Sequence, residues 1–484
     1  MMSGESDGRL YRHIVKGMAV FGGTQMLTML SNIVKGKFVA ILLSDYGMGL
    51  SSLMQSALAP MQQLFSFGLP TAGIKEIASE QDVQGRASVV VAFRRTIFTL
   101  AVLGALTMLL GAGLFSKSTF GNDEYTSWFM LMSAALFFFI LASGEVTILQ
   151  GYRMLKEFAT CNIVGAVSGL LTGVPLYYFY GVRGIVPAMI FLSVVSFLVA
   201  RFFTRRIEQP ADVQSWNETL QRSRKLLLLG GTMMVSSVIG TLTTYFINTF
   251  VRERGGISDV GLFQAANVIT LQCVSLVFYA MATDYYPHLS SVSEDKAATR
   301  RLVRSEAEIV VFVMAPIIGL LILFSPLVVR ILLTPKFNPI IPLLRLIALS
   351  FWGRALCFPI DYVCIAKGDK SFFFWTQGVW SNVKRFALMA MGYAGWGLIG
   401  LGCAVVLDNL IDIVVSLLLN RWRYQVSYSM SMLRFVVPLF LLNLSSLVAC
   451  FTMNTVYSTI VMSLSAVVTC VISYRLLRRR LKTD

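Results

Sequence analysis

The chain has 484 residues, of which 56% are hydrophobic and 14% are charged. A soluble domain averages about 25% charged residues and fewer apolar ones, so this composition excludes an ordinary soluble fold. Apolar runs of about 18 residues or more recur along the whole chain, which predicts an all-α protein that crosses a membrane many times.

The apolar runs, taken in chain order, predict about fourteen membrane-spanning helices. The second run is only weakly apolar, and its assignment depends on its residue pattern. The predicted helices are 14–43, 47–70, 88–115, 127–150, 158–180, 185–204, 226–251, 261–286, 307–331, 341–365, 371–394, 396–420, 431–451 and 456–475.

The connecting loops are short, none of them longer than about 25 residues. They leave no room for a soluble catalytic or nucleotide-binding domain, and the chain contains neither a GxxxxGK[ST] loop nor an HExxH motif. We therefore expect a transporter and not an enzyme, with no cofactor and no metal site. The seven cysteines form no CxxC pair and mostly lie in apolar runs, so we expect small buried side chains and not disulfides.

Basic residues give the chain a formal net charge of +16. With fourteen helices both termini share one side of the membrane, and 29 of the 41 Lys and Arg residues fall on that side, against 6 on the other. This bias predicts that both termini are cytoplasmic. The charge then faces anionic lipid, which argues against a nucleic-acid partner. Residues 1–13 are polar, so we expect no cleaved signal peptide.

Weak self-similarity runs through the chain at a nearly constant offset. "FGGTQMLTML" at 21–30 resembles "LGGTMMVSSV" at 229–238, and "QGYR" at 150–153 resembles "KGDK" at 367–370. Two copies of a six-helix unit would enter the membrane in the same sense, which predicts two parallel lobes with a site at their interface. The predicted division is an N-lobe at 1–208, a C-lobe at 209–425, and two further helices with a basic tail at 426–484.

Once the basic residues near helix ends are assigned to one side of the membrane or the other, six cations remain within the membrane: Lys35, Lys37, Arg345, Arg354, Lys384 and Arg385. Charged residues within a membrane usually face the bundle interior or a water-filled cavity. One face of the first helix is polar, and at about 100° per residue its stripe contains Gln25, Thr28, Asn32 and Lys35. We expect Lys35 to bind an anionic ligand from this stripe. Lys37 lies among apolar residues near the helix end and should extend toward the interface.

The second helix supports an aqueous cavity through a second polar face, which contains Ser52, Gln55, Ser56, Gln63 and Ser66. Hydrogen bonds between helices are the alternative explanation of this face. In the later helices, Arg345 lies near a helix end and Arg354 lies near mid-membrane on the same face as Asp361. Lys384 and Arg385 are adjacent and point about 100° apart, so at most one faces a narrow cavity, and the pattern leaves open which.

Intramembrane carboxylates offer an alternative explanation of these cations, which would then only neutralise them. The carboxylates concerned are Glu145, Asp361, Asp408 and Asp412. Asp408 and Asp412 are four residues apart and repel each other if both ionise, so they could titrate, hold a cation or have a structural role. Asp284 ends its helix before Pro287 and opposes the helix dipole, which indicates a cationic partner or a gate.

Four segments carry a family resemblance: "GGTQMLTMLSNIVKGKFVAILL" at 22–43, "FGLPTAGIKEIASE" at 67–80, "AMATDYYPHLSSV" at 280–292 and "LLRLIALSFWGRALCFPIDYVCIAKG" at 343–368. Over about residues 10–480 the chain resembles the Wzx-type oligosaccharide flippases of the multidrug/oligosaccharidyl-lipid/polysaccharide superfamily, in the O-antigen translocase branch. The resemblance implies a V-shaped, two-lobed fold of fourteen helices in the bacterial cytoplasmic membrane. It implies movement of a polyprenyl-pyrophosphate-linked oligosaccharide from the inner to the outer leaflet, with a groove for the lipid tail at the last helices.

Such a cargo carries a pyrophosphate, which fixed Lys and Arg side chains can bind in place of water. The expected substrate-binding residues are Lys35, Arg354, Lys384, Arg385, Gln25, Asn32, Gln55 and Gln63. The expected gate or ion-coupling residues are Asp284, Asp361, Asp408 and Asp412. Membrane lipids, a coupling ion (H⁺ or Na⁺) and other membrane proteins of glycan assembly are the candidate partners.

Two other functions compete with this interpretation. An ion-coupled multidrug exporter of the same superfamily would need acidic groups in its cavity, whereas the intramembrane cations here match or outnumber the acids. A membrane-embedded glycan polymerase or glycosyltransferase would usually carry a large catalytic loop, which this chain lacks. The sequence assigns no sugar, coupling ion or oligomeric state.

Overall fold

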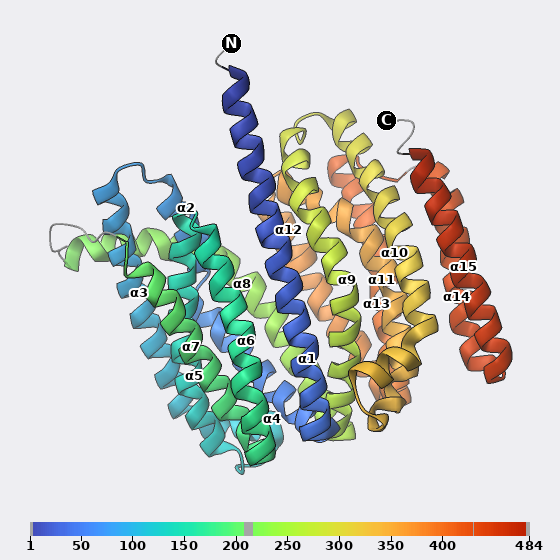
Figure 1. Ribbon diagram of the computed structural model, residues 1–484, viewed down its shortest axis with the longest axis horizontal. Helices are drawn as coiled ribbons and strands as arrows, with labels where there is room; N and C mark the ends of the chain where they lie inside the picture. Colours follow the sequence, from blue (N-terminus) through green and yellow to red (C-terminus); the bar gives the residue numbers. More distant parts are fainter. Residues whose placement is uncertain (1–2, 208–215, 429, 481–484) are drawn as a thin grey trace. The chain divides into compact units, whose positions relative to one another are not determined.

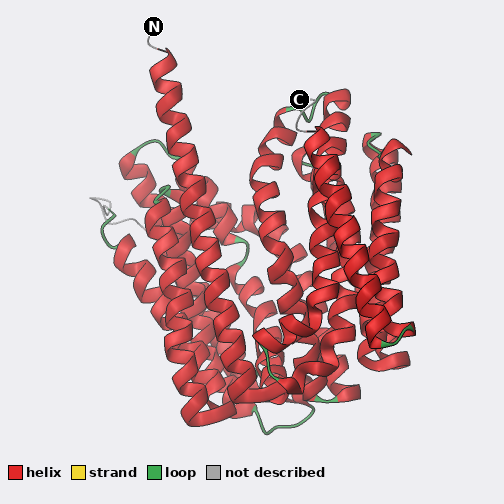
Figure 2. Ribbon diagram, turned by 45° about the vertical axis from the view of Figure 1, so that its right-hand side comes forward, coloured by secondary structure: helices red, strands yellow, loops and turns green. Residues whose placement is uncertain are grey.

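The computed structural model describes residues 3–207, 216–428 and 430–480. Within these ranges the chain is almost entirely helical and contains no strand (Figure 2). The elements are α1 (Ser3–Ser66), α2 (Leu69–Ser79), α3 (Val83–Leu110), α4 (Ala112–Phe120), α5 (Thr126–Gly151), α6 (Leu155–Tyr180), η1 (Gly181–Gly184), α7 (Ile185–Thr204), α8 (Trp216–Gly255), α9 (Ile257–Ser291), α10 (Lys296–Leu332), η2 (Pro335–Ile340), α11 (Ile341–Ala366), α12 (Lys370–Phe373), η3 (Phe374–Trp380), α13 (Ser381–Tyr424), α14 (Met430–Thr452) and α15 (Thr455–Arg480).

Eleven helical segments within the described ranges are long and apolar enough to cross a membrane. Each of the fourteen predicted helices overlaps one of these segments, and three segments each overlap two predicted helices. Those three segments are Met26–Ser79, Leu155–Thr204 and Lys370–Tyr424. The all-α, multi-pass architecture predicted from the sequence is therefore confirmed.

Each of the three long segments is interrupted where the sequence predicts a boundary between two helices. Ser44 interrupts α1 with a φ of 61°, and the 3₁₀ turn η1 separates α6 from α7. In α13 the interruption is at Trp396 and Gly397, and Gly397 has a φ of 59° that glycine adopts without steric cost. A Cβ atom on Gly392 would lie 2.4 Å from the carbonyl oxygen of Gly400, so the chain reverses here and α13 is a helical hairpin.

The first compact unit comprises Met1–Glu253. In it α5 packs between α3 and α7, and α6 packs against both α7 and α1 (Figure 1). Small residues allow this close approach: a Cβ on Gly144 would lie 2.9 Å from Cγ2 of Ile97, and one on Gly104 would lie 2.9 Å from the Phe65 ring. Phe93 and Phe129 fill the interior and are fully buried.

The second compact unit comprises Arg254–Asp484. Its centre is α11, which packs against α10 on one side and α13 on the other (Figure 1). The approach of α13 depends on Gly353, because a Cβ there would lie 2.6 Å from Cβ of Asn409. The helices α14 and α15 pack on each other and on α10. Asn443 fixes this contact by donating a hydrogen bond to the carbonyl oxygen of Ala315 at 3.0 Å.

Candidate functional site

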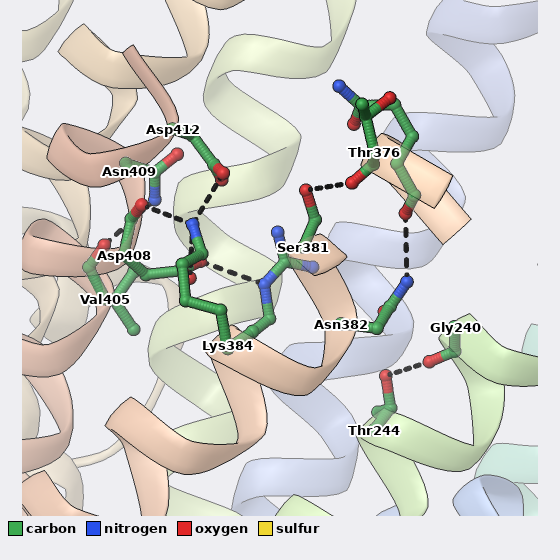
Figure 3. A network of polar contacts seen from close by, with 12 residues as sticks. Gly240, Thr244, Thr376, Ser381, Asn382, Lys384, Val405, Asp408, Asn409 and Asp412 are labelled. Carbon is green, nitrogen blue, oxygen red and sulfur yellow. Dashed lines mark hydrogen bonds and ion pairs between the residues drawn. The ribbon is translucent and has the colours of Figure 1, made fainter. Parts of the chain in front are cut away.

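A buried ion cluster joins the two arms of the α13 hairpin in the second unit (Figure 3). Nζ of Lys384 lies 2.5 Å from Oδ1 of Asp412 and 3.0 Å from Oδ1 of Asp408. It also donates a hydrogen bond to the main-chain carbonyl of Asp408 at 2.8 Å. Because Lys384 contacts both carboxylates, it offsets the repulsion expected between the two aspartates at i and i+4. Its side chain is only 7% exposed.

Arg385 joins the same cluster from its outer side. Its Nε lies 3.0 Å from Oδ2 of Asp408, and its side chain is 43% exposed. The adjacent cations thus have different surroundings, as their angular separation on the helix requires. Lys384 is enclosed by carboxylates, while Arg385 keeps N–H donors available on the exposed side.

Asp361 on α11 lies close to this cluster but has a different hydrogen-bond partner. Its Oδ1 accepts a hydrogen bond from Ser416 at 2.8 Å. Asp361, Asp412 and Ser416 line a narrow crevice together with Thr376 and Gln377. The last two belong to η3, a stretch of π-helix, a geometry that often occurs at functional sites.

The π-helical stretch is tied to the start of α13 by side-chain hydrogen bonds (Figure 3). Asn382 donates to the carbonyl oxygens of Gln377 at 3.1 Å and Gly378 at 2.7 Å, and Ser381 donates to that of Thr376 at 3.0 Å. These bonds hold the π-helical stretch, which supplies Thr376 and Gln377 to the crevice, against the first turn of α13.

Arg354 is an exposed cation on α11. Its guanidinium carbon lies 5.8 Å from the ring centroid of Phe278, a cation–π distance. Among the described residues it forms no ion pair with a carboxylate. Although Arg354 and Asp361 share a helix face by sequence, the carboxylate bonds to Ser416.

Lys35 is the corresponding cation of the first unit, since it too lies within a membrane-spanning segment. It is half-buried on α1, where a Cβ on Gly169 of α6 would lie 3.8 Å from its Nζ. Within the described part of the chain it too forms no ion pair with a carboxylate. Lys37 and Asn32 are exposed, and the buried hydroxyl of Thr28 has no partner among the described atoms.

The polar face predicted for residues 47–70 divides into two parts. Gln55 and Gln63 are exposed, and Gln55 donates a hydrogen bond to Ser51 at 2.9 Å. Ser52 and Ser56 are buried, as is Ser66, and Ser56 donates to the carbonyl of Leu53 at 2.9 Å. The glutamines are therefore available to a ligand, while the serines face the interior. The side chains of Gln25 and Asp284 lie outside the described residues.

Sequence reasoning missed the partners of Glu145. This buried carboxylate on α5 binds Arg94 of α3 through two hydrogen bonds, at 3.0 and 2.9 Å, and contacts Arg201 of α7 at 3.3 Å. Thr204 donates to it as well. Both arginines lie inside helices, a signal that could have separated them from ordinary loop charges. Arg345, which lies near the start of α11, donates to Ser325 of α10 at 2.8 Å.

Comparisons with known proteins agree with this architecture. A relative from Shigella flexneri, named provisionally as an O-antigen transporter, is 24% identical over 397 residues, which cover 80% of this chain and 92% of the relative. The lipid III flippase of Escherichia coli (strain K12) is 22% identical over 378 residues, which cover 76% of this chain and 87% of the flippase.

Solved structures show the same fold at low sequence identity. An inward-facing multidrug resistance MATE family transporter of the MOP superfamily superposes with a TM-score of 0.69 at 16% identity, covering 82% of this chain and 94% of that one. The lipid II flippase MurJ in an inward closed conformation has a TM-score of 0.67 at 14% identity, covering 96% of this chain and 99% of that one.

The sequence model of one family matches residues 14–293, which is more than half of the chain. The match runs through α1, where Lys35 lies, and through the Glu145 cluster to the end of α9. The chain belongs to the polysaccharide biosynthesis protein family, as its resemblance to the oligosaccharide flippases predicts.

Proposed function

We propose that this protein flips a polyprenyl-pyrophosphate-linked oligosaccharide, such as an O-antigen unit, from the inner to the outer leaflet of the bacterial cytoplasmic membrane. The observation that carries the proposal is the pair Lys35 and Arg354. Each is a cation within a membrane-spanning segment, and neither forms an ion pair with a carboxylate among the described residues. The names of the relatives, an O-antigen transporter and a lipid III flippase, support the same substrate class.

The physical argument concerns the cost of a charge in hydrocarbon. A lysine or arginine at the centre of a membrane helix costs about 2.5–3.5 kcal/mol on insertion scales, so a cation there without a structural partner is expected to serve a ligand. A pyrophosphate that crosses the membrane loses its hydration and needs cationic partners. Arg354 can bind two phosphate oxygens through its planar fork, and Lys35 acts as a point charge.

The other residues expected to bind substrate differ in whether they can contact it directly. Arg385 is half-buried at the cluster edge and can add a guanidinium to the substrate, and Asn32, Gln55 and Gln63 are exposed side chains that can bind sugar hydroxyls. Lys384 is held by two carboxylates, so we propose that it positions Asp408 and Asp412 and contacts the cargo only indirectly. Gln25 continues the polar stripe of α1 in the sequence.

The aspartates are proposed as the gate or ion-coupling group of an alternating-access cycle. Asp361 and Asp412 line the same crevice, where H⁺ or Na⁺ could bind. Asp284 is proposed as a gate from its sequence position. The six-helix repeat at 1–208 and 209–425 supports a rocking motion of two lobes, with residues 426–484 outside the repeat.

A multidrug exporter is the alternative, and the charge at the site distinguishes the two. An exporter of cationic drugs needs uncompensated carboxylates, whereas Asp408 and Asp412 are each paired with Lys384. Asp361 accepts from Ser416 and forms no ion pair among the described residues, so the distinction rests on the cations Lys35 and Arg354, which likewise lack a carboxylate there. A membrane-embedded glycan polymerase is a less favoured alternative, because the names of the relatives describe a transporter and a flippase.

A gene knockout tests the proposed function. We expect the knockout strain to accumulate lipid-linked oligosaccharide on the cytoplasmic side and to lose surface glycan, and plasmid-borne protein should reverse both. Normal surface glycan without accumulated intermediate would contradict the proposal. Increased sensitivity to cationic drugs in the same strain would instead favour the exporter.

Labelling of introduced cysteines tests the proposed orientation. Both termini should be cytoplasmic because of the bias of basic residues to their side. Ser3→Cys and Thr483→Cys, each in a cysteine-free background, should react with a membrane-impermeant thiol reagent only after the cells are opened. Labelling of either position in intact cells would reverse the proposed topology.

A further inference from the structure

A hollow of about 480 Å³ lies on the surface of the first unit, lined by residues of α3, α5 and α7. We call it the α3–α5–α7 pocket. Four phenylalanines from the three helices contact one another through their rings. The ring centroids are 6.0 Å apart for Phe98 and Phe137, 5.3 Å for Phe137 and Phe138, and 5.9 Å for Phe138 and Phe197. The pocket therefore has a continuous aromatic wall.

One end of this pocket is strongly basic. Its lining includes Arg94, Arg95 and Arg201, and the carboxylate of Glu145 lies among them. Arg94 directs its Nε and Nη2 donors at Glu145, whereas Arg201 contacts it through Nη1 alone and has a side chain that is 39% exposed. Two arginines, Arg94 and Arg201, thus share the one carboxylate of Glu145, and because a guanidinium carries five N–H donors, Arg201 retains donors on its exposed side.

The aromatic and basic parts follow each other along the helix axes. Leu141 and Phe137 precede Glu145 on α5 by four and eight residues, which places them about 6 and 12 Å deeper in the bundle at 1.5 Å per residue. Phe197 lies one turn from Arg201 on α7 in the same sense. The pocket thus changes from cationic near the helix ends to apolar further into the membrane-spanning segments.

We propose that the α3–α5–α7 pocket binds a bilayer phospholipid with an anionic phosphodiester headgroup. The phosphate accepts hydrogen bonds from the exposed side of Arg201, and an acyl chain lies along the four phenylalanines. Basic pockets between membrane helices are suited to such headgroups. A zwitterionic headgroup brings its own cation to the arginines and is disfavoured. This lipid is separate from the transported cargo, and the assignment does not depend on the proposed function.

The test uses the full-length protein, purified in detergent and depleted of lipid, with phosphatidylglycerol, phosphatidylcholine and inorganic phosphate as separate probes. Native mass spectrometry counts the retained lipid, and thermal unfolding gives the shift in Tm on lipid addition. We expect one phosphatidylglycerol to be retained and to raise Tm. Phosphatidylcholine should bind more weakly and phosphate should have no effect, because the acyl chain contributes to binding.

Two variants and two matched controls locate the site. Arg201→Gln and Phe98→Gln should each weaken phosphatidylglycerol binding by about tenfold or more, as expected for loss of a charged hydrogen bond or a large apolar contact. Phe98 is 54% exposed, so its replacement should leave the fold intact even where the Arg201 variant is poorly folded. Arg205→Gln and Phe202→Gln change an exposed arginine and an exposed phenylalanine outside the pocket and should bind as the unmodified protein does.

Several results would overturn the assignment. Equal retention of phosphatidylcholine would remove the role of the basic end, and a Tm rise with phosphate alone would indicate a free-anion site. Equal losses in the control variants, or unchanged binding in Phe98→Gln, would place the lipid elsewhere. Displacement of phosphatidylglycerol by equimolar polyprenyl pyrophosphate would assign the pocket to a polyprenyl lipid and not to a bilayer phospholipid.

Discussion

The two compact units each hold a buried carboxylate between two basic side chains, but they build these clusters in different ways. Glu145 is held by side chains from α3 and α7, which are far apart in the sequence, and its partners Arg94 and Arg201 are 22% and 39% exposed. Asp408 is held within one helical hairpin, where the Lys384 side chain is 7% exposed and the Asp408 side chain 2%. From this comparison we expect that enclosure, more than the number of ion pairs, decides how much the stability of the fold depends on a charge.

Loss of the enclosed lysine is expected to have the largest effect on stability. Lys384→Met leaves Asp412 without its partner and Asp408 with Arg385 alone, and breaking a buried pair typically costs about 3–5 kcal/mol. Thermal unfolding in detergent should show a large fall in Tm and a low yield of folded protein. Replacing both aspartates by asparagine in the same chain should recover much of the loss. An equal or greater loss from Arg385→Met would show that enclosure is not the deciding factor.

Removal of the first unit's carboxylate should cost less. Glu145→Gln leaves Arg94 and Arg201 without their acid, but both are partly exposed and can be solvated, so we expect a loss of about 1–3 kcal/mol. The same thermal unfolding assay measures it, with Arg205→Gln as a control at the same end of α7. A loss of stability as large as that of Lys384→Met would contradict the expected difference between the two units.

A carboxylate outside the membrane-spanning segments should contribute least. Partial burial acts to raise the pKa of Asp369, but hydrogen bonds from the Phe372 amide, the Tyr424 hydroxyl and the Arg423 guanidinium outweigh it and hold the pKa below its usual value. The stabilisation is therefore fully present above the ordinary aspartate pKa of about 3.9 and is lost as the pH falls through the lower pKa of the folded state.

Asp369→Asn makes this small contribution measurable. The variant should have a slightly lower Tm than the unmodified protein at pH 7, and the difference should shrink as the pH is lowered below about 4. Unfolding curves at a series of pH values give the difference. A difference in Tm that does not change with pH would contradict this account. It would show that the asparagine weakens the N-terminal cap of α12, which the Asp369 side chain forms, and that the lost charge contributes nothing.

Much of the fold followed from hydropathy because a membrane restricts the chain to long apolar helices. The boundaries predicted near residues 44, 181 and 395 match real interruptions, since Ser44, the η1 turn and Gly397 each break the helical backbone. The α13 hairpin was predicted as two helices at 371–394 and 396–420, with the π-helical stretch unforeseen. Helix periodicity does not distinguish π from α over seven residues.

The site was less predictable, because periodicity places a side chain on a face but does not identify its partner. The spacing of Asp408 and Asp412 indicated one face, yet only the hairpin brings Lys384 between them. The stripe in residues 47–70 mixed exposed glutamines with buried serines, a division that depends on packing. Glu145 was recognised as an intramembrane acid, but its arginines come from helices about 50 residues away in the sequence.

The central claim is that membrane-embedded cations without a carboxylate partner bind the anionic cargo. The most direct test is surface glycan in a knockout strain that carries Lys35→Ala or Lys37→Ala at matched protein levels. Lys35→Ala should abolish most flipping, and Lys35→Arg should retain part of it because the charge remains while its geometry changes. Lys37 is exposed near the helix end, so Lys37→Ala should be nearly silent. Full activity of Lys35→Ala, or a loss confined to Lys37→Ala, would contradict the account.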